Sequence, residues 1–439
     1  MTMSSTVPGT VRRDVIAACG ALTLVIGLAS PAAAQIRPSI AAVTFAPAKT
    51  MQPDPLTVQD WVKRPEMIGG DFRADLRKRG FTFNASWTQF FQWSPDTGDT
   101  RIWDYGGKLD ARMSQDFSLY GWEGLSGTAH VQFRYGDVPR LAGGTFVPTN
   151  AALIFPEAEG SVADVSSFYL TKTFGANARL EAGRFDTFDM AERTFTGGGG
   201  LDKFSNLAFV SAPLYARTIP FIAEGVFFTT LRNAEPLVTV GLLESTEEGF
   251  FKNGATFYAS VALPMKFFDT PSHYVFTATA SSTTATSLDQ DPYVFLPSFT
   301  APLATENNAW TFDFTFDQYL LWDPATKTGF GLFGMIGASD SNPSPIDIFG
   351  HIGVGGTSPI PKRSQDNFGV GYYFTGISNT LVDTLVPLVR IRDENGFEGF
   401  YNYAVTGWSK VSAHVQFVDP FTVGSKTRAF FSIRWKLTF

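Results

Sequence analysis

Cysteine is almost absent from this chain of 439 residues, in which Cys19 is the single thiol. It lies in residues 1–34, which we predict to be a secretory signal peptide, because two arginines precede an apolar run that ends in small residues up to Ala34. Cleavage after Ala34 would leave a mature chain without cysteine. Such a chain forms neither a disulfide nor a thiolate metal site, so packing and hydrogen bonds alone must hold its fold.

Two further features are missing: an excess of positive charge and a long apolar stretch. Acidic residues outnumber basic residues by 41 to 34, which argues against nucleic acid as a partner, because such interfaces need clustered Lys and Arg. No stretch approaches the roughly 20 consecutive apolar residues of a membrane-spanning helix. The sequence therefore predicts an exported protein without a membrane helix.

Aromatic side chains, by contrast, are abundant and alternate with polar ones. Aromatic residues make up 15% of the chain and charged residues only 17%. The most informative pattern is the C-terminal segment 427–439, in which one face carries Thr427, Ala429, Phe431, Ile433, Trp435, Leu437 and Phe439. The other face carries Arg428, Phe430, Ser432, Arg434, Lys436 and Thr438. Because strand side chains alternate between two faces, this pattern predicts a strand with one face for lipid and one for water.

Similar segments recur from residue 81 to the end, about sixteen in all, each near the length of a tilted strand that crosses a membrane. Long connections follow odd-numbered segments, at 137–163, 188–219, 282–309 and 377–395. Short connections follow even-numbered segments, at 175–177, 232–235, 322–327 and 406–408. This alternation is typical of outer-membrane barrels with short periplasmic turns, longer outer loops and both termini in the periplasm. We therefore predict an all-β fold, a transmembrane antiparallel β-barrel of about 16 strands over residues 81–439.

Residues 35–80 form the predicted periplasmic N-terminal segment, whose end has the pattern of a short helix. Asp71 is placed to cap the start of this helix, and Asp75 is placed to pair with Arg79. Gly80 is placed to end it. The predicted organisation is therefore a signal peptide (1–34), this helical segment, and the barrel.

Short motifs are spread over most of the mature chain. They are Gly70-Asp71-Phe72-Arg73 with Leu76 and Gly80, Leu180-Glu181-Ala182-Gly183-Arg184-Phe185, Phe204-Ser205-Asn206, Glu398, Tyr401-Asn402-Tyr403, Gln416-Phe417-Val418-Asp419-Pro420 and the final Phe439. In their order and spacing, these motifs resemble those of the carbohydrate-selective porin B family of Gram-negative outer membranes. Phe72 stands where family members usually carry Trp. The resemblance implies a sixteen-stranded barrel for passive uptake of mono- or small oligosaccharides.

The connection 188–219 is the longest and is our candidate for a constriction. A closed sheet of about sixteen strands encloses a water-filled lumen, so the barrel alone does not select its cargo. The connection carries several charges, including Arg193 and Arg217, beside the glycine run 197–200. We expect it to fold into the barrel. The alternative is a solvated outer loop whose glycines only relax the backbone.

Strand parity and the loop charges give a set of candidate channel-lining residues. The set is Asp104, Lys108, Asp110, Arg112, Gln132, Arg134, Arg179, Glu181, Arg184, Arg193 and Arg217. Arginine and carboxylate groups can hydrogen-bond the hydroxyl rim of a pyranose while an aromatic ring stacks on its C–H face. Strict alternation puts Arg184 on the side of Leu180 and Ala182, and only a bulge at Gly183 would turn it inward. Alternatively, these charges merely hydrate the wall and pair with one another.

The pattern indicates no catalytic, cofactor or metal site, because the four histidines are scattered without ligand spacing. We therefore predict a porin and not an enzyme. A broad-specificity or ion-selective porin and an outer-membrane barrel hydrolase remain the alternatives. The expected partners are the carbohydrate in transit, outer-membrane lipid and lipopolysaccharide, and the outer-membrane assembly machinery. The sequence does not distinguish a monomer from a homotrimer, because lipid-exposed and subunit faces look alike.

Overall fold

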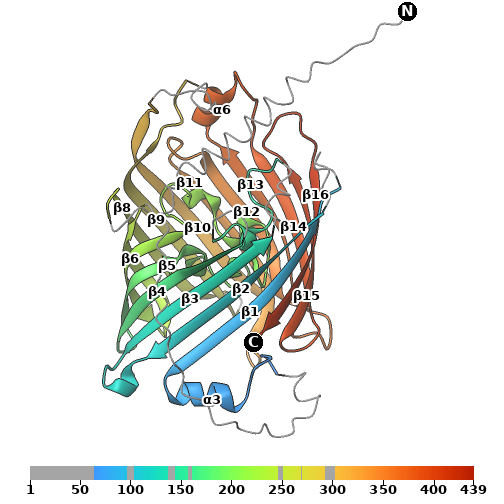
Figure 1. Cartoon of the computed structure of the whole chain (residues 1–439). Coiled ribbons are helices and arrows are strands. Elements are labelled where there is room, and N and C mark those ends of the chain that lie inside the picture. Colours follow the sequence, from blue (N-terminus) through green and yellow to red (C-terminus); the bar gives the residue numbers. More distant parts are fainter. Residues whose placement is uncertain are drawn as a thin grey trace, which may run out of the picture.

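The computed structural model describes residues 64–95, 103–136, 144–156, 161–245, 251–267, 269–291 and 302–439. Sixteen strands in this part of the chain form one closed antiparallel barrel, in which each strand pairs with its neighbours in sequence and β1 pairs with β16 (Figure 1). The predicted fold class is confirmed. The predicted signal peptide and the lead-in up to residue 63 lie outside the described residues.

The strands have 9 to 19 residues, at or above the roughly 9–11 that a tilted strand needs to cross a bilayer. They are β1 (Phe81–Trp93), β2 (Trp103–Asp116), β3 (Leu125–Gly136), β4 (Val162–Phe174), β5 (Ala178–Asp186), β6 (Ile222–Arg232), β7 (Glu235–Glu244), β8 (Ala255–Phe267), β9 (Thr270–Thr286), β10 (Thr305–Asp323), β11 (Thr328–Ser339), β12 (Ile346–Thr357), β13 (Asn367–Ile377), β14 (Glu394–Ala404), β15 (Ser409–Asp419) and β16 (Arg428–Thr438). Each of the alternating segments found in the sequence corresponds to one of these strands.

The first and last strands close the barrel in a continuous register. Trp87 lies opposite Leu437, and Trp93 lies opposite Phe431. The rings of Trp93 and Phe431 pack with centroids 5.0 Å apart. Closure pairs the backbone of residues 86–93 with that of residues 431–438, so these groups are not exposed to hydrocarbon. The terminal strand predicted from the sequence is thus the closing strand.

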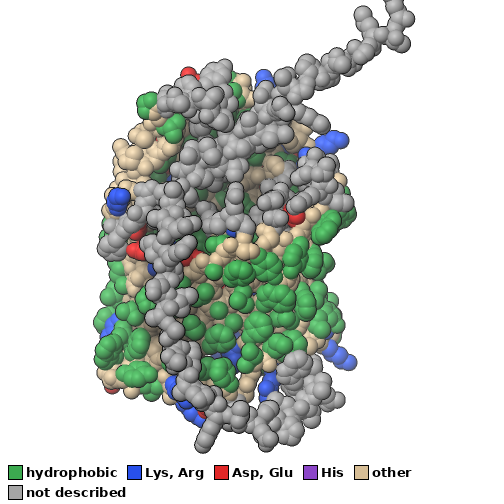
Figure 2. All heavy atoms as spheres, viewed as in Figure 1, with side chains coloured by type: hydrophobic (Ala, Val, Ile, Leu, Met, Phe, Trp, Pro, Cys, Tyr) green, Lys and Arg blue, Asp and Glu red, His purple; other side chains and the backbone are tan. Residues whose placement is uncertain are grey.

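The two faces of the wall differ in polarity as the alternation predicts. In β16, Phe431, Ile433 and Trp435 are exposed on the outside. Ser432 and Arg434, which lie between them, are buried on the inside. Hydrophobic side chains form a broad band on the outer face (Figure 2). An apolar surface of this extent is unfavourable in water and suits acyl chains.

The connections at the two ends of the barrel differ in length. Those that follow β3, β5, β9 and β13 are long, whereas the turns that follow β4, β6, β10 and β14 span a few residues. The long connections lie at the end of the barrel that carries α6 (Asn379–Leu385), and the C-terminus and α3 lie toward the other end (Figure 1). Within the described residues, no helix has the length and apolar character required to cross a membrane.

The short helix predicted before the barrel is α3 (Asp71–Lys78), but its ends differ in detail from the prediction. Gly70 takes the N-cap position and no side chain caps the helix start. Asp75 pairs with Lys78 at 2.9 Å rather than with Arg79. The helix ends at Lys78, so Arg79 no longer lies one full turn beyond Asp75.

Arg73 of α3 connects the helix to both ends of the barrel chain. It is buried, and its Nη1 donates to the Phe83 carbonyl oxygen at 2.7 Å. Its Nε donates to the Ile68 carbonyl oxygen at 2.9 Å, and its Nη2 donates to an oxygen of the terminal residue Phe439. A charged donor of this kind stabilises the junction more than a neutral one does.

We predict that Arg73→Ala destabilises the folded barrel by roughly 2 kcal/mol, because hydrogen bonds to a charged group are lost. The heat-modifiable band in electrophoresis should disappear at a lower temperature than in the wild type. Arg77→Ala on the exposed face of the same helix is the matched control and should leave that temperature unchanged. Equal temperatures for Arg73→Ala and Arg77→Ala would contradict the role of this junction.

Candidate functional site

Two long connections enter the barrel. We call them inserted segment 1 (144–156, between β3 and β4) and inserted segment 2 (187–221, between β5 and β6). Segment 1 contains η3 (Ala151–Leu153), and segment 2 contains α4 (Thr187–Met190), η4 (Gly198–Gly200), α5 (Leu207–Val210) and η5 (Pro213–Tyr215). Their apolar side chains form one buried cluster with inner-face residues of β11 to β16. The inward path expected for residues 188–219 is therefore the one observed.

Phenylalanines of inserted segment 2 fit against glycines of the wall. The centroid of the Phe204 ring lies 4.4 Å from that of Phe209 and 4.8 Å from that of Phe400. A Cβ atom built on Gly371 of β13 would come within 2.6 Å of Phe209. Only a hydrogen atom fits at such a distance. The glycine in β13 therefore leaves the space that this ring fills.

Two buried glutamates of β14 bind the backbone of the inserted segments. Glu398 accepts hydrogen bonds from the Ser205 and Asn206 amides, each at 2.8 Å, and it also contacts the His414 imidazole at 2.9 Å. Glu394 accepts from the Val147 amide at 2.9 Å. A carboxylate that is fully buried costs several kcal/mol unless it is paired or hydrogen-bonded. Each inserted segment therefore supplies hydrogen-bond donors to a carboxyl group that it covers on the inner face of the wall.

Arg434 of the closing strand ties inserted segment 2 to the wall. Its Nη1 donates to the Gly200 carbonyl oxygen at 2.7 Å, and its Nη2 donates to Asn402 Oδ1 at 2.9 Å. Lys436, two residues further along β16, forms an ion pair with Asp202. Burial alone would raise the pKa of Asp202, but the positive charge of Lys436 outweighs burial and holds this pKa at about 2. Asp202 is thus ionised at neutral pH.

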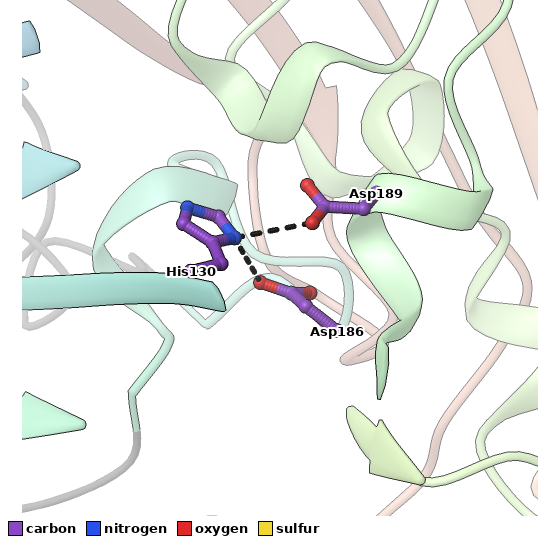
Figure 3. A group of neighbouring side chains, drawn as sticks. All are labelled: His130, Asp186 and Asp189. Atoms are coloured by element: carbon purple, nitrogen blue, oxygen red, sulfur yellow. Dashed lines mark hydrogen bonds and ion pairs between the residues drawn. The ribbon is translucent and has the colours of Figure 1, made fainter. Parts of the chain in front are cut away.

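The start of inserted segment 2 contacts charged side chains of β2 and β3. His130 of β3 lies between carboxylates, with Nε2 2.9 Å from Asp110 Oδ2 and Nδ1 3.1 Å from Asp189 Oδ2. Its Nδ1 also lies 3.8 Å from Asp186 Oδ2 (Figure 3). Arg112 forms an ion pair with Asp189. The cluster joins two wall strands to the start of the segment.

A cavity of about 630 Å³ lies between the inserted segments and the wall of β8 to β12. Its lining combines aromatic side chains such as Phe209 with polar groups such as Arg193 and Asp313. Asp313 accepts hydrogen bonds from the Tyr215 hydroxyl and, at 2.9 Å, from the Thr315 hydroxyl. This lining can offer both apolar surface and hydrogen-bonding groups to a small molecule.

Comparison with known families identifies this architecture. The model of the carbohydrate-selective porin, OprB family, matches residues 118–439. The chain belongs to this family. It is a passive carbohydrate porin of the outer membrane, and its family and fold are those of a channel rather than of an enzyme.

Solved structures share the fold of this OprB-family porin. The high-pH structure of Pseudomonas putida OprB matches with a TM-score of 0.73 and 15% identity, over 86% of this chain and 99% of that chain. The low-pH structure of Pseudomonas putida OprB matches with a TM-score of 0.55 and 13% identity, over 86% and 99% of the two chains. A comparison with curated proteins gives no sequence match.

The porin buries four of the residues that we expected to line its water-filled lumen. They lie on the inner face, as parity predicts, but are only 2% to 6% exposed: Asp104, Lys108, Gln132 and Arg134. Arg134 Nε donates to the Pro156 carbonyl oxygen of inserted segment 1 at 2.9 Å. Gln132 Nε2 donates to Asp186 Oδ2 at 2.5 Å. The expectation treated the wall as bare. Inserted segment 1 packs against β2 and binds Arg134, whereas Gln132 binds Asp186 at the end of β5.

Other predicted residues keep contact with water inside the porin. The side chains of Arg112 and Asp110 are 41% and 21% exposed. Arg179 and Glu181 are 37% and 18% exposed and form an ion pair at 3.0 Å. These four remain candidates for contact with a solute in transit.

The strand register directs Arg184 toward the outer face of the wall. Its register opposite the exposed Phe168 is continuous through Gly183, so the strand has no bulge there. The shift occurs instead between β3 and β4, next to His130. Arg184 forms an ion pair with Asp164 at 3.5 Å. Because Asp164 lies opposite the inward-facing Gln132, the place of Arg184 in the channel lining stays a prediction.

The two loop arginines have different surroundings. Arg193 lines the cavity, and its Nη1 donates to the Glu192 carbonyl oxygen at 3.1 Å. Arg217 Nε donates to the Pro343 carbonyl oxygen at 3.2 Å, and burial lowers the pKa of its guanidinium. Arg193 thus faces the cavity, whereas Arg217 links inserted segment 2 to the connection after β11.

Sequence reasoning missed the residues that hold the inserted segments. Arg434 was predicted only as part of the water-facing side of the last strand, and His414 was one of the four scattered histidines. Glu394 fell in the predicted connection 377–395. Glu398 and the Ser205–Asn206 pair stood out only as separate motifs, yet the structure joins them by hydrogen bonds. A carboxylate and a loop motif that are both typical of the family could have suggested this contact, but no spacing rule connects positions so far apart in the chain.

We predict that Gly371→Ala displaces inserted segment 2, because its methyl group would overlap the Phe209 ring. Overpacking of this kind costs about 1–3 kcal/mol. Single-channel recordings should give noisier or larger conductance than the wild type. Gly399→Ala in the neighbouring strand is the control, since its nearest neighbour would lie at an ordinary 3.6 Å. Indistinguishable recordings from the two variants would count against the packing role of this glycine.

We also predict an acid-sensitive contribution from Asp202. Its pKa of about 2 lies below the value of about 3.9 for an unfolded aspartate, so its ionised form stabilises the fold. This contribution is present above about pH 4 and is lost as the pH falls toward 2. It should amount to about 1 kcal/mol or less, because the Asp202 side chain is 45% exposed and solvent screens the pair. Thermal unfolding at pH 6, 4, 3 and 2 should show a smaller acid-induced loss in Asp202→Asn than in the wild type; an equal loss would refute the prediction.

Proposed function

We propose that sugars cross this porin through the passage between the inserted segments and the wall of β8 to β12, with the 630 Å³ cavity as its selective part. The observation that supports this proposal is the cavity itself, which borders both inserted segments and several wall strands. Its volume falls within the roughly 300–1,000 Å³ of typical small-molecule sites. A mono- or small oligosaccharide is therefore of suitable size.

The lining suits the two kinds of surface that a pyranose presents. Its ring hydroxyls can bond to Asp313, Tyr215 and Thr315 on one side of the cavity. Its C–H faces can pack against Phe209 and Phe221. Because these contacts are weak and numerous, a sugar can enter and leave quickly, as passive diffusion requires.

Arg193 is the candidate selectivity residue at this site. It lines the cavity, and the guanidinium carries donors beyond the one used by Glu192. We propose that Arg112, Arg179 and Glu181 offer further weak contacts along the water-accessible wall. Charged hydrogen bonds of this kind are stronger than neutral ones, so their loss should be measurable.

We further propose how the porin sits in its membrane. The end with α3 and the C-terminus faces the periplasm, and the end with the long connections faces outward, which agrees with the usual asymmetry of such barrels. The apolar outer band contacts lipid and lipopolysaccharide. The closing strand, β16, is the segment presented to the outer-membrane assembly machinery.

We predict that Arg193→Met weakens sugar-dependent block of single-channel current in planar bilayers. The half-blocking concentration of glucose or maltose should rise about tenfold, which corresponds to the loss of one charged hydrogen bond of about 1.5 kcal/mol. The open-channel conductance in salt should change much less.

The exposed Arg390 supplies the matched control for this experiment. Arg390→Met removes the same charge outside the proposed passage and should leave the half-blocking concentration unchanged. If sugars block both variants as they block the wild type, the cavity does not select the cargo. If no sugar attenuates the current of the wild type, the proposed passage is wrong altogether.

A further inference from the structure

The charged cluster at the root of inserted segment 2 has the geometry of a metal site. One ligand atom each from His130, Asp186 and Asp189 lies within 4.8 Å of the others. The His130 Nδ1 atom is 3.1 Å from Asp189 Oδ2 and 3.8 Å from Asp186 Oδ2 (Figure 3). A tetrahedral Zn²⁺ with bonds of about 2.0–2.2 Å holds its ligand atoms roughly 3.3–3.5 Å apart. The observed separations bracket this value.

The opposite side of the His130 ring has the partner that a metal-bound imidazole usually has. Nε2 lies 2.9 Å from Asp110 Oδ2, so an Nε2–H group donates to this carboxylate. In the neutral tautomer that carries its hydrogen on Nε2, the lone pair of Nδ1 points toward Asp186 and Asp189. Carboxylate partners of this kind orient the histidine and make its metal-binding nitrogen more basic.

In that tautomer, three electron-pair donors converge on one point. A lone pair on Nδ1 and the oxygens of Asp186 and Asp189 repel one another unless a positive charge lies among them. Arg112 supplies part of this charge, since it contacts Asp189 and its Nη2 lies 3.4 Å from Nδ1. The Arg112 side chain is 41% exposed, so it can move into the lumen water when another cation takes its place.

An unpartnered amide oxygen gives a second, independent indication of a ligand. Gln132 is 2% exposed, and its Oε1 has no hydrogen-bond partner among the described residues. The same amide reaches the cluster, where its Nε2 lies 2.5 Å from Asp186 Oδ2 and 3.4 Å from His130 Nδ1. A buried oxygen without a partner is energetically unfavourable. Rotation of the amide by half a turn would offer this oxygen to an ion in the cluster as a fourth ligand.

We infer that this cluster binds a divalent transition-metal ion of the zinc class through His130, Asp186 and Asp189. The mixed nitrogen and oxygen ligands favour Zn²⁺ over Ca²⁺ or Mg²⁺, which prefer oxygen ligands alone. The site differs from the expectation drawn from the sequence, because His130 and Asp189 are 59 residues apart and match no ligand-spacing motif. The bound ion would fix the start of inserted segment 2 to β3. This inference is independent of the sugar passage proposed above.

Titration of untagged, detergent-solubilised porin with Zn²⁺ at pH 8 tests the inference. Isothermal titration calorimetry should detect one bound ion per chain, and the temperature of heat modification should rise with Zn²⁺ but not with Ca²⁺. Asp110→Asn, which removes the partner of His130, should weaken Zn²⁺ binding about 10–100-fold. Arg112→Met should strengthen binding, because the competing cation is gone.

The choice of variants keeps the result decisive even if one of them fails to fold. His130→Asn should abolish the Zn²⁺ response, and Asp189→Asn, at a more exposed position, should reduce it at least tenfold. His273→Asn removes a histidine elsewhere in the barrel and should bind as the wild type does. Identical Zn²⁺ titrations for the wild type and either cluster variant would overturn the inference. The inference would also be overturned if the stability of the porin changed with pH but did not respond to Zn²⁺ at pH 8. In that case a proton, and not a metal ion, would lie between His130 and the two aspartates.

Discussion

The structure depends on the hydrogen bonds that two buried carboxylates of β14 accept from the inserted segments. A barrel of sixteen strands closes its own wall, but it offers nothing to hold a loop inside a wide aqueous space. Glu398 and Glu394 provide that hold, because each is fully buried and receives backbone N–H groups from a different segment. Without the segments these carboxyl groups would face the lumen water, and without the carboxyl groups the buried amides of the segments would lose their acceptors. Wall and insert therefore stabilise each other.

The same interior explains why the glycines of β13 and the phenylalanines of inserted segment 2 belong together. Gly369 and Gly371 face the rings of Phe204 and Phe209, and a side chain at either glycine would come within 2.7 Å of a ring carbon. Close packing of this kind gains dispersion energy over many contacts and resists displacement of the loop. The inner face of β13 thus carries glycines at the positions where inserted segment 2 places its phenylalanine rings. As a result the remaining open volume is shifted toward β8 to β12, where the cavity lies.

The strands, their number and the direction of their faces could be predicted because each depends on local alternation and on the two different solvents. The terminal segment 427–439 illustrates this: Phe431 faces out and Arg434 faces in, as the pattern requires. The position of the constriction was predictable only as a long connection. Which residues bind it depends on contacts between distant segments, such as Glu398 with Asn206, and alternation carries no information about those. For this reason Lys108 and Arg134 were placed on the correct face but in the wrong environment.

This difference changes the physical account of selectivity. Charges on a bare lumen wall would create a strong field across the passage and favour ions over neutral solutes. In this porin, many of the inward-facing charges are neutralised by an adjacent side chain of opposite charge. Asp202 pairs with Lys436, Asp189 pairs with Arg112, and Arg179 pairs with Glu181. Such pairs hold the insert in place while the net field along the path is reduced. A neutral, hydroxyl-rich molecule that forms hydrogen bonds and stacks on aromatic rings meets less competition from ions in such a passage, which is consistent with a carbohydrate-selective family.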